Sequence, residues 1–269
     1  MVMKRTYAIY IFLLLALAAC QTIPESERLI PLPAASGERA CLLIDFSAWQ
    51  CVNCPSAAEE AHTLLEQYGD QLIVIEAHPA TNGLTKPPAK YPEYDYTCPA
   101  ADSLYIRFGG TNVTPLPTGV VNMKQYPDGA YFKPYQEWGT HIYSAMQSYD
   151  SVDITLTYNA DEQIAYTVAN YSAKAMDCTL YMYLTEDSII SAQKFPDANS
   201  TDYVRNHLLR DAILPHKGIP VSLAPETEIS NTVSYTLPDK VVPAHSHIVA
   251  ALYHNGEIIQ TRQATVSNP

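Results

Sequence analysis

The chain has 269 residues, of which 47% are apolar and 16% are charged. Such a composition supplies enough apolar surface for two packed domains and excludes a disordered chain. Acidic residues outnumber basic ones by 28 to 16, and the basic residues are scattered along the chain. Nucleic acid is therefore not expected as a partner.

The N-terminus has the pattern of a bacterial export signal. Basic residues precede an apolar run over residues 8–19, which is too short for a membrane span. The run ends in Leu17-Ala18-Ala19-Cys20, which resembles a lipobox and implies cleavage before Cys20 and lipidation of its thiol. An ordinary signal peptide or an uncleaved anchor helix is the alternative. We expect a signal peptide at residues 1–19 and a lipidated tether at residues 20–37.

The envelope is also where a disulfide can persist. Gln21 differs from the aspartate that resembles an inner-membrane retention signal, so an outer-membrane lipoprotein is expected. The periplasmic face is favoured, and the outer surface stays open. Of six cysteines, lipidation of Cys20 leaves five, an odd number, so at least one thiol stays unpaired or pairs transiently.

The first half of the chain alternates strand and helix patterns. Apolar runs predict buried strands at Ala40 to Phe46 and Leu72 to Ala77, and apolar residues at helical spacing predict a helix from Pro55 to Tyr68 between them. Strand, helix and strand in this order form one βαβ unit. Further on, the pattern predicts a proline-rich segment at 78–97, a helix from Pro99, a strand at 119–123, a turn at 126–130 and a helix at 135–149.

After Asp150 the apolar residues alternate strictly, as in strands with one buried face. Short alternating strands without βαβ spacing predict an all-β antiparallel sandwich, Ig-like or jelly-roll-like. We therefore place an α/β domain at 38–150 and a sandwich at 151–269. One helical interruption is expected, because five polar or aromatic residues have the spacing of one face of a short helix: Asp202, Tyr203, Asn206, His207 and Arg210. We expect this helix to dock onto the sandwich, and ligand binding by this face is the alternative.

A Cys-x-x-Cys pair, Cys51 and Cys54, lies between the first strand and the first helix. Redox-active thiols are held at such a junction, because a helix N-terminus stabilises a thiolate. A permanent structural disulfide is the alternative, since the envelope permits inert disulfides. Cys41 and Cys178 have the pattern of buried apolar residues. Cys98 is expected to be the more exposed, as a reactive thiol or a partner of Cys41.

Two resemblances follow from these residues. The stretch from Leu43 to Cys51, with Asp45 six residues before the first cysteine, resembles the strand and turn of thioredoxin, and Pro117-Thr118 resembles its cis-proline. Nearly the whole mature chain is similar to the Omp-28-related outer-membrane lipoproteins. The segments that carry this similarity are Asp45-Phe46, Cys51 to Pro55, Pro117 to Asn122, Leu184 to Asp187 and Asp202 to Arg210. The family implies a thioredoxin-like half joined to a β-sandwich half.

If the cysteine pair is redox-active, the position of each site residue predicts its role. An exposed Cys51 attacks a substrate disulfide, and a more buried Cys54 resolves the mixed disulfide. Asp45 takes the proton from Cys54, which requires a pKa raised by burial. Pro117 in cis leaves the backbone of Leu116 available to an extended substrate and keeps metals from the thiols.

Each role has a plainer alternative. Asp45 is otherwise a satisfied carboxylate at a strand end, and Pro117 an ordinary loop proline. Trp49 and Thr118 are further candidates for substrate contact, although packing is the expected role of Trp49. His245 and His247 share one strand face without a matching carboxylate or cysteine, so no metal is expected, and no cofactor is implied.

Two functions from different classes remain open. The first is a membrane-anchored thiol–disulfide oxidoreductase that acts on disulfides of exported proteins. The second is a non-catalytic envelope lipoprotein that serves a binding or structural purpose. The residues between the cysteines, Val52-Asn53, indicate neither a reductase nor an oxidase.

Overall fold

The computed structural model describes residues 39–86, 95–147, 151–159 and 161–266. The predicted signal peptide, Cys20 and the tether lie outside these ranges, as does part of the proline-rich segment. Within the described ranges, no helix combines the length and apolar character needed to cross a membrane.

The predicted strand–helix–strand unit is present near the start of the described chain. Strand β1 (Cys41–Phe46) leads through helix α3 (Cys54–Tyr68) and a short 3₁₀ helix, η1 (Gly69–Gln71), to strand β2 (Leu72–Ala77). The two strands pair in parallel over their whole length, and every residue of both is buried. Helices then cover both faces, which explains why both strands have continuous apolar sequences.

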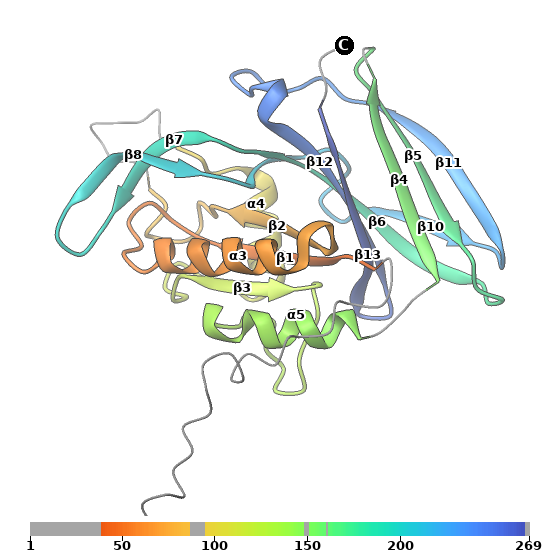
Figure 1. The fold of residues 1–269 in the computed structure, drawn as a ribbon, viewed down its shortest axis with the longest axis horizontal. Helices are drawn as coiled ribbons and strands as arrows, with labels where there is room; N and C mark the ends of the chain where they lie inside the picture. Colours follow the sequence, from red (N-terminus) through yellow and green to blue (C-terminus); the bar gives the residue numbers. More distant parts are fainter. Residues whose placement is uncertain (1–38, 87–94, 148–150, 160, 267–269) are drawn as a thin grey trace, which may run out of the picture. The chain divides into compact units, whose positions relative to one another are not determined.

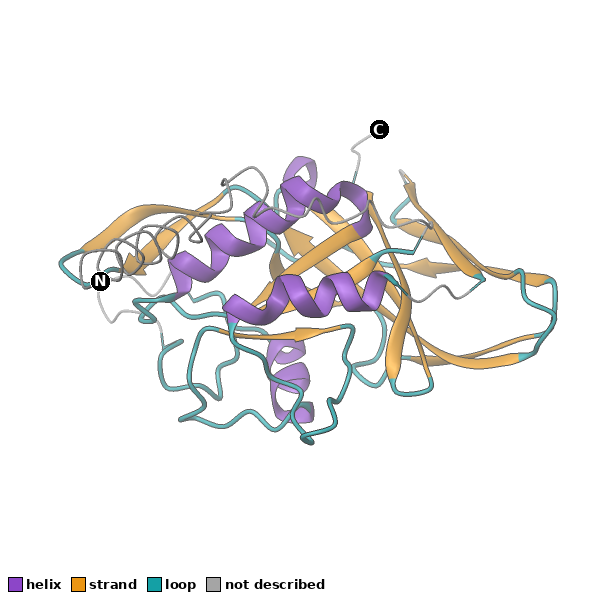
Figure 2. Ribbon diagram, turned by 60° about the horizontal axis from the view of Figure 1, so that its bottom comes forward, coloured by secondary structure: helices purple, strands orange, loops and turns teal. Residues whose placement is uncertain are grey.

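The rest of the first half adds one strand and two helices. Helix α4 (Pro99–Arg107) comes next, and strand β3 (Thr118–Val121) pairs antiparallel with β1. The predicted last helix begins as a 3₁₀ turn, η3 (Tyr135–Glu137), and continues as α5 (Trp138–Met146). In Figure 2 the helices gather over one part of the structure, and strands extend beyond them.

The second half is built almost entirely of strands, with one 3₁₀ turn, η4 (Pro243–His245). In chain order they are β4 (Val152–Asn159), β5 (Gln163–Asn170), β6 (Met176–Glu186), β7 (Ile189–Lys194), β8 (Asn199–Arg205), β9 (Leu208–Ala212), β10 (Ile219–Leu223), β11 (Thr227–Ser234), β12 (Ser246–His254) and β13 (Glu257–Thr265). The protein is thus β-rich, with mixed sheets and few helices.

One sheet joins the two halves of the chain. Its strand order is β13-β12-β6-β9-β2-β1-β3, with β10 also paired to β6. Strand β9 provides the junction, because it pairs with β2 at Glu76 and Leu208 and with β6 on its other side. Two smaller sheets accompany it, β11-β5-β4 and the hairpin β7-β8. Figure 1 shows β4, β5 and β11 side by side and the β7–β8 hairpin in a separate position. The division into domains near residue 150 stays a prediction.

Three apolar clusters fill the spaces between these layers. One face of β1 packs on α4 through Leu42, Ile44 and Phe46, and this cluster also contains Tyr183 from β6. The opposite face of β1 packs on α3 and α5. The third cluster joins β4 and β5 to β6 and β12, which is the sandwich-like packing that the alternating sequence predicts.

The predicted helix over Asp202 to Arg210 is wrong. These residues form the end of β8, a two-residue connection and most of β9. The helical spacing applied to polar side chains, whereas the buried residues here are Arg205, Leu208 and Leu209, which strand pairing with β7, β6 and β2 accommodates. Tertiary pairing therefore overrides the local pattern in this segment.

Candidate redox site

The Cys51–Cys54 disulfide lies where β1 passes into α3. The two Cα atoms are 5.4 Å apart. A tight turn sets this position, because the Cys51 N–H donates to the Ala48 carbonyl and the Cys54 N–H donates to the Cys51 carbonyl. Pro55 in the first turn of α3 suits a position where no intrahelical donor is needed. The pair therefore lies at a helix N-terminus, as the sequence predicts.

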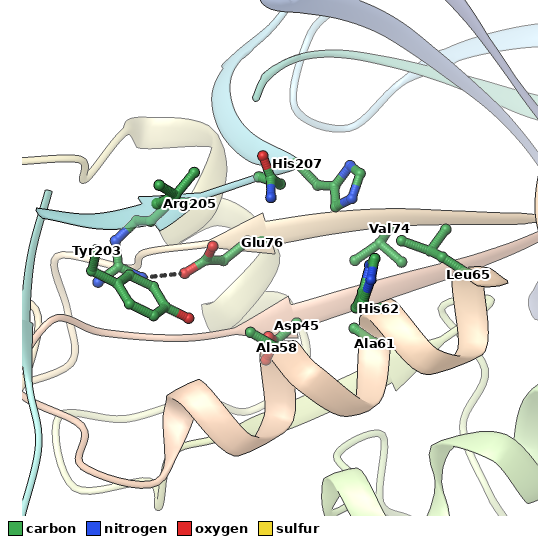
Figure 3. A pocket seen from close by; sticks show the side chains of 12 residues that line it. Asp45, Ala58, Ala61, His62, Leu65, Val74, Glu76, Tyr203, Arg205 and His207 are labelled. Carbon is green, nitrogen blue, oxygen red and sulfur yellow. Dashed lines mark hydrogen bonds and ion pairs between the residues drawn. The ribbon is translucent and has the colours of Figure 1, made fainter. Parts of the chain in front are cut away.

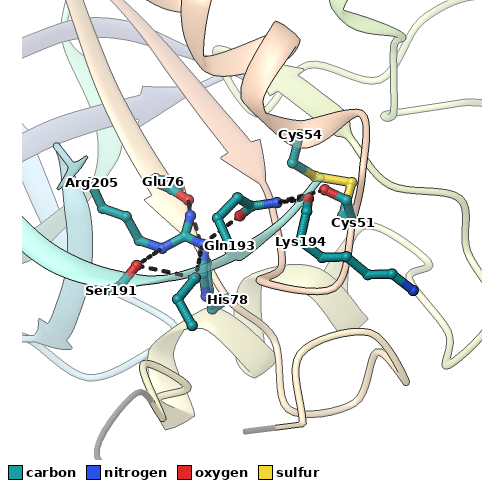
Figure 4. A network of polar contacts seen from close by, with 9 residues as sticks. Cys51, Cys54, Glu76, His78, Ser191, Gln193, Lys194 and Arg205 are labelled. Carbon is teal, nitrogen blue, oxygen red and sulfur yellow. Dashed lines mark hydrogen bonds and ion pairs between the residues drawn. A yellow bond between two sulfur atoms is a disulfide. The ribbon is translucent and has the colours of Figure 1, made fainter. Parts of the chain in front are cut away.

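Cys51 is buried, so the predicted exposure is wrong. Cys51 is 3% exposed and Cys54 is 2% exposed, although Val52 between them is 36% exposed. Strand β7 covers the turn (Figure 4): the side-chain amide Nε2 of Gln193 donates to the Cys51 carbonyl at 2.8 Å, and the Lys194 N–H donates to the Trp49 carbonyl at 2.8 Å. A segment about 140 residues away in the sequence thus buries the disulfide.

Asp45 lies inside the fold, beneath α3. It is 3% exposed, and burial raises the pKa of its carboxyl well above the usual 3.8. The neighbouring Glu76 carboxylate raises that pKa further, and the Arg205 guanidinium opposes the increase. Burial and the Glu76 carboxylate thus both favour the protonated form of the Asp45 carboxyl. Its Oδ1 atom has no hydrogen-bond partner among the described residues.

A small cavity of about 90 Å³ opens beside Asp45. Figure 3 shows Asp45 next to Ala58 of α3, with Glu76 and Tyr203 farther from that helix. The other lining residues come from α3, β2 and the end of β8: Ala61, His62, Leu65, Val74, Val204, Arg205, Asn206 and His207. This volume is enough for a few water molecules, which an unpartnered carboxyl oxygen can bind.

Glu76 carries the buried negative charge of the site. It lies next to Asp45, since the two residues are register partners on β1 and β2. Burial alone would raise the pKa of Glu76, but the Arg205 guanidinium, with His78 and Ser47, lowers it to about 2. Burial lowers the pKa of His78, whose Nε2 lies 2.8 Å from Glu76 Oε1. A neutral His78 therefore donates to an ionised Glu76.

Arg205 joins this charge to the segment that covers the disulfide. Its Nη1 lies 2.7 Å from Glu76 Oε1, and its Nη2 donates to Gln193 Oε1 at 2.7 Å. Nε donates to Ser191 Oγ, and Nη2 also donates to the Ala192 carbonyl. The Gln193 amide then reaches Cys51, so one chain of hydrogen bonds runs from Glu76 to the disulfide turn (Figure 4).

The remaining predicted site residues lie around β3 and the turn. The Leu116–Pro117 peptide bond is cis, as the sequence predicts, and Leu116 belongs to the same apolar cluster as Cys51 and Cys54. Thr118 begins β3 opposite Phe46 and is buried. Trp49 is partly exposed, and its indole N–H donates to the Lys86 carbonyl.

The other cysteines are separate from the disulfide. Cys41 is a free thiol at 1% exposure on β1, and burial raises its pKa to about 12. Cys98 is a partly buried free thiol, and burial raises its pKa to about 11. Cys178 is buried in β6. Over the described ranges, no three His, Cys, Asp or Glu side chains are grouped to hold a metal ion.

Sequence reasoning missed Glu76, His78, Gln193 and Arg205. A signal was present in β2, because Glu76 interrupts the apolar run Leu72 to Ala77, and a charge in a buried strand requires a partner. Nothing in the sequence shows that this partner is Arg205, 129 residues further on.

The fold and the site together define a β-rich protein with a helix-terminal disulfide above a buried aspartate whose pKa is raised. A family model described as outer membrane protein Omp28 matches residues 105–268. The chain therefore belongs to the Omp28 family, which confirms both the family and the outer-membrane location that the sequence predicts.

Among solved structures, the chain is similar to HBP35 of Porphyromonas gingivalis, with 15% identity and a TM-score of 0.64 over 86% of this chain and 76% of that one. A structural-genomics protein from Agrobacterium tumefaciens has 11% identity and a TM-score of 0.52, over 87% of this chain and 98% of that one. A domain of the outer membrane lipoprotein Omp28 from Porphyromonas gingivalis has 20% identity over 44% of this chain and 95% of that one, with a TM-score of 0.27. No curated protein matches the chain.

Proposed function

We propose that this protein is a lipid-anchored thiol–disulfide exchange protein of the outer membrane that acts on exported proteins. Cys20 carries the lipid, and residues 38–150 form a thioredoxin-like unit next to a β-sandwich at residues 151–269. The observation that carries the proposal is the Cys51–Cys54 disulfide at the N-terminus of α3, above an aspartic acid whose pKa is raised by burial. Perturbed carboxyl groups of this kind are typical of sites that transfer protons.

The exchange follows from these positions. A substrate thiolate attacks Cys51 Sγ, the bond between the two sulfurs breaks, and its electron pair leaves on Cys54. Protonated Asp45 gives its proton to the Cys54 thiolate. A second substrate thiolate then attacks the substrate sulfur of the mixed disulfide, and Cys51 leaves as a thiolate stabilised by the helix N-terminus. The substrate dithiol becomes a disulfide, and the cysteine pair gains its two electrons.

The reverse sequence reduces a substrate disulfide, and Asp45 then takes the proton from Cys54. Proximity supports this role, because Asp45 lines the cavity with Ala58, which is one helical turn after Cys54. Leu116, Thr118 and Trp49 are the proposed contacts for the substrate backbone.

The alternative is a non-catalytic envelope lipoprotein in which Cys51 and Cys54 form a structural disulfide. Its support is the burial of both cysteines under β7, since a pair that never exchanges needs no access. Under this alternative, Asp45 is a buried carboxyl group that takes no part in proton transfer.

Reduction of insulin by dithiothreitol separates the two functions. The full-length protein in detergent should accelerate insulin precipitation, because dithiothreitol reduces the pair and the pair then reduces insulin. Cys51→Ser should abolish the acceleration, whereas Cys41→Ser should preserve it. A wild-type rate equal to that of dithiothreitol alone would leave the structural alternative. In cell fractions, Cys20→Ser should move the protein from the membrane to the soluble fraction; unchanged membrane retention would remove the lipid anchor from the proposal.

A further inference from the structure

The β7–β8 hairpin contacts the first half of the chain at its base and near its tip, and the Tyr96 hydroxyl also donates to the Ile190 carbonyl on β7. At the base, Arg205 is 2% exposed and binds Glu76 through a buried ion pair. The same guanidinium bonds to Ser191, Ala192 and Gln193, so it fixes β7 from the neighbouring strand. The low pKa of Glu76 keeps the ion pair charged at any pH above about 2. We call this pair the anchor.

Near the tip, two hydrogen bonds between described residues join β7 to the disulfide turn. They run from the Gln193 side chain to the Cys51 carbonyl and from the Lys194 N–H to the Trp49 carbonyl. Both are neutral, and each is worth about 1 kcal/mol, or about fivefold in an equilibrium constant. We call these two bonds the latch. The latch is weaker than a buried ion pair, because breaking the ion pair leaves an uncompensated charge inside the fold.

Two residues that flank the hairpin have an unusual backbone conformation. Ser188 has φ 59° and His207 has φ 60°, both in the left-handed region that non-glycine residues seldom adopt. Neighbouring bonds fix these positions: the Ser188 N–H donates to Asn206 Oδ1, and the His207 carbonyl accepts from the Glu76 N–H. The base is therefore held in place, and the part of the hairpin beyond it is joined to the first half by weaker contacts.

From this difference we propose that the β7–β8 hairpin is a gate over the Cys51–Cys54 disulfide. The anchor stays in place while the latch opens, and the open state admits a thiol to Cys51. Because the gate regulates the exchange site, it rests on the proposed function. Access of a thiol to the disulfide can nevertheless be measured without any catalytic turnover. Gln193 and Lys194 are positioning residues in this scheme, because they act through the Cys51 turn.

A single position allows a matched test. Lys194→Pro removes the N–H that binds Trp49 and leaves the Gln193 contact, whereas Lys194→Ala removes the same side chain and retains the N–H. The full-length protein in detergent is treated with dithiothreitol, quenched with acid, alkylated and weighed by mass spectrometry. Reduction of the disulfide should be about fivefold faster in Lys194→Pro than in Lys194→Ala, the factor for one hydrogen bond.

A second variant tests the side-chain half of the latch. Gln193→Glu retains an oxygen for Arg205 but places a carboxylate oxygen against the Cys51 carbonyl, so reduction should again be at least about fivefold faster than in wild type. Thr201→Ala, on the exposed part of β8, is the control and should react at the wild-type rate.

Cys41 reports whether the whole fold has opened instead. This thiol is 1% exposed, so alkylation under native conditions requires opening of the main sheet. Faster reduction with unchanged Cys41 labelling supports the gate. Equal rates in Lys194→Pro and Lys194→Ala, or a parallel increase in Cys41 labelling, overturns it. If insulin is not reduced but the latch variants still react faster with dithiothreitol, the gate stands and the proposed function fails.

Discussion

Replacement of Arg205 by Met should destabilise the protein strongly, because it leaves the Glu76 carboxylate buried without its partner. The cost follows from the pKa of Glu76, which falls from 4.5 to about 2 in the fold. At about 1.4 kcal/mol per pH unit, the ionised form is stabilised by about 3 kcal/mol. Loss of the bonds to Ser191 and Gln193 adds to this cost.

Urea unfolding at pH 7, followed by circular dichroism, measures the effect. With a slope of roughly 3 kcal/mol per molar urea for a chain of this size, the midpoint should fall by about 1 M or more. The double variant Arg205→Met with Glu76→Gln should recover much of that loss, because no buried charge remains. Arg262→Met is the matched control: its ion pair with Asp153 is partly exposed and should cost about 1 kcal/mol or less.

The Glu76 carboxylate should also make the free energy of unfolding depend on pH. Because the pKa of folded Glu76 lies below its unfolded value, its contribution to stability is present above about pH 4.5 and is lost as the pH falls toward 2.

An Arg205→Met midpoint within about 0.2 M of wild type at pH 7 would refute the reasoning. So would a double variant as unstable as the single one.

Three further predictions concern single positions. Asp45→Asn should raise the melting temperature at pH 7 and leave it unchanged below pH 3.8. The reason is that the pKa of Asp45 is higher in the folded than in the unfolded protein, so Asp45 costs stability as the pH rises above 3.8. A lower melting temperature of the variant at pH 7 would contradict this raised pKa. Alkylation under native conditions should modify Cys98 slowly and Cys41 hardly at all, since their pKa values are about 11 and about 12; mass spectrometry of the peptides measures both, and equal labelling would contradict the fold. Gly119→Ala places a Cβ 2.5 Å from the Trp138 ring and should cost about 1–3 kcal/mol in urea unfolding, whereas an unchanged midpoint would show that Trp138 moves freely.

The local part of the site could be predicted from the sequence. Helical spacing after Cys54 and the apolar run before Asp45 fix the turn between them, because these signals depend on residues a few positions apart. The burial of Asp45 also follows, since a carboxylate inside an apolar strand is enclosed by whatever covers that strand.

The cover of the disulfide could not be predicted in this way. Cys51 was expected to be exposed, and the residues that bury it, Gln193 and Lys194, belong to a strand that the sequence did not reveal. The segment around Arg205 was assigned to a helix because polar side chains have helical spacing there. The conformation of this segment depends on the buried ion pair between Arg205 and Glu76, which are 129 residues apart in the sequence. A local sequence period cannot predict a contact over such a separation.

The reduction potential of the Cys51–Cys54 pair tests the proposed exchange most directly. Equilibration of the full-length protein with dithiothreitol and glutathione buffers, followed by alkylation and mass spectrometry, gives the fraction reduced at each potential. A pair that exchanges with exported proteins should have a potential above about −300 mV, as known thiol–disulfide exchange proteins do. A value well below about −300 mV, with no insulin reduction, would show a structural disulfide and contradict the account.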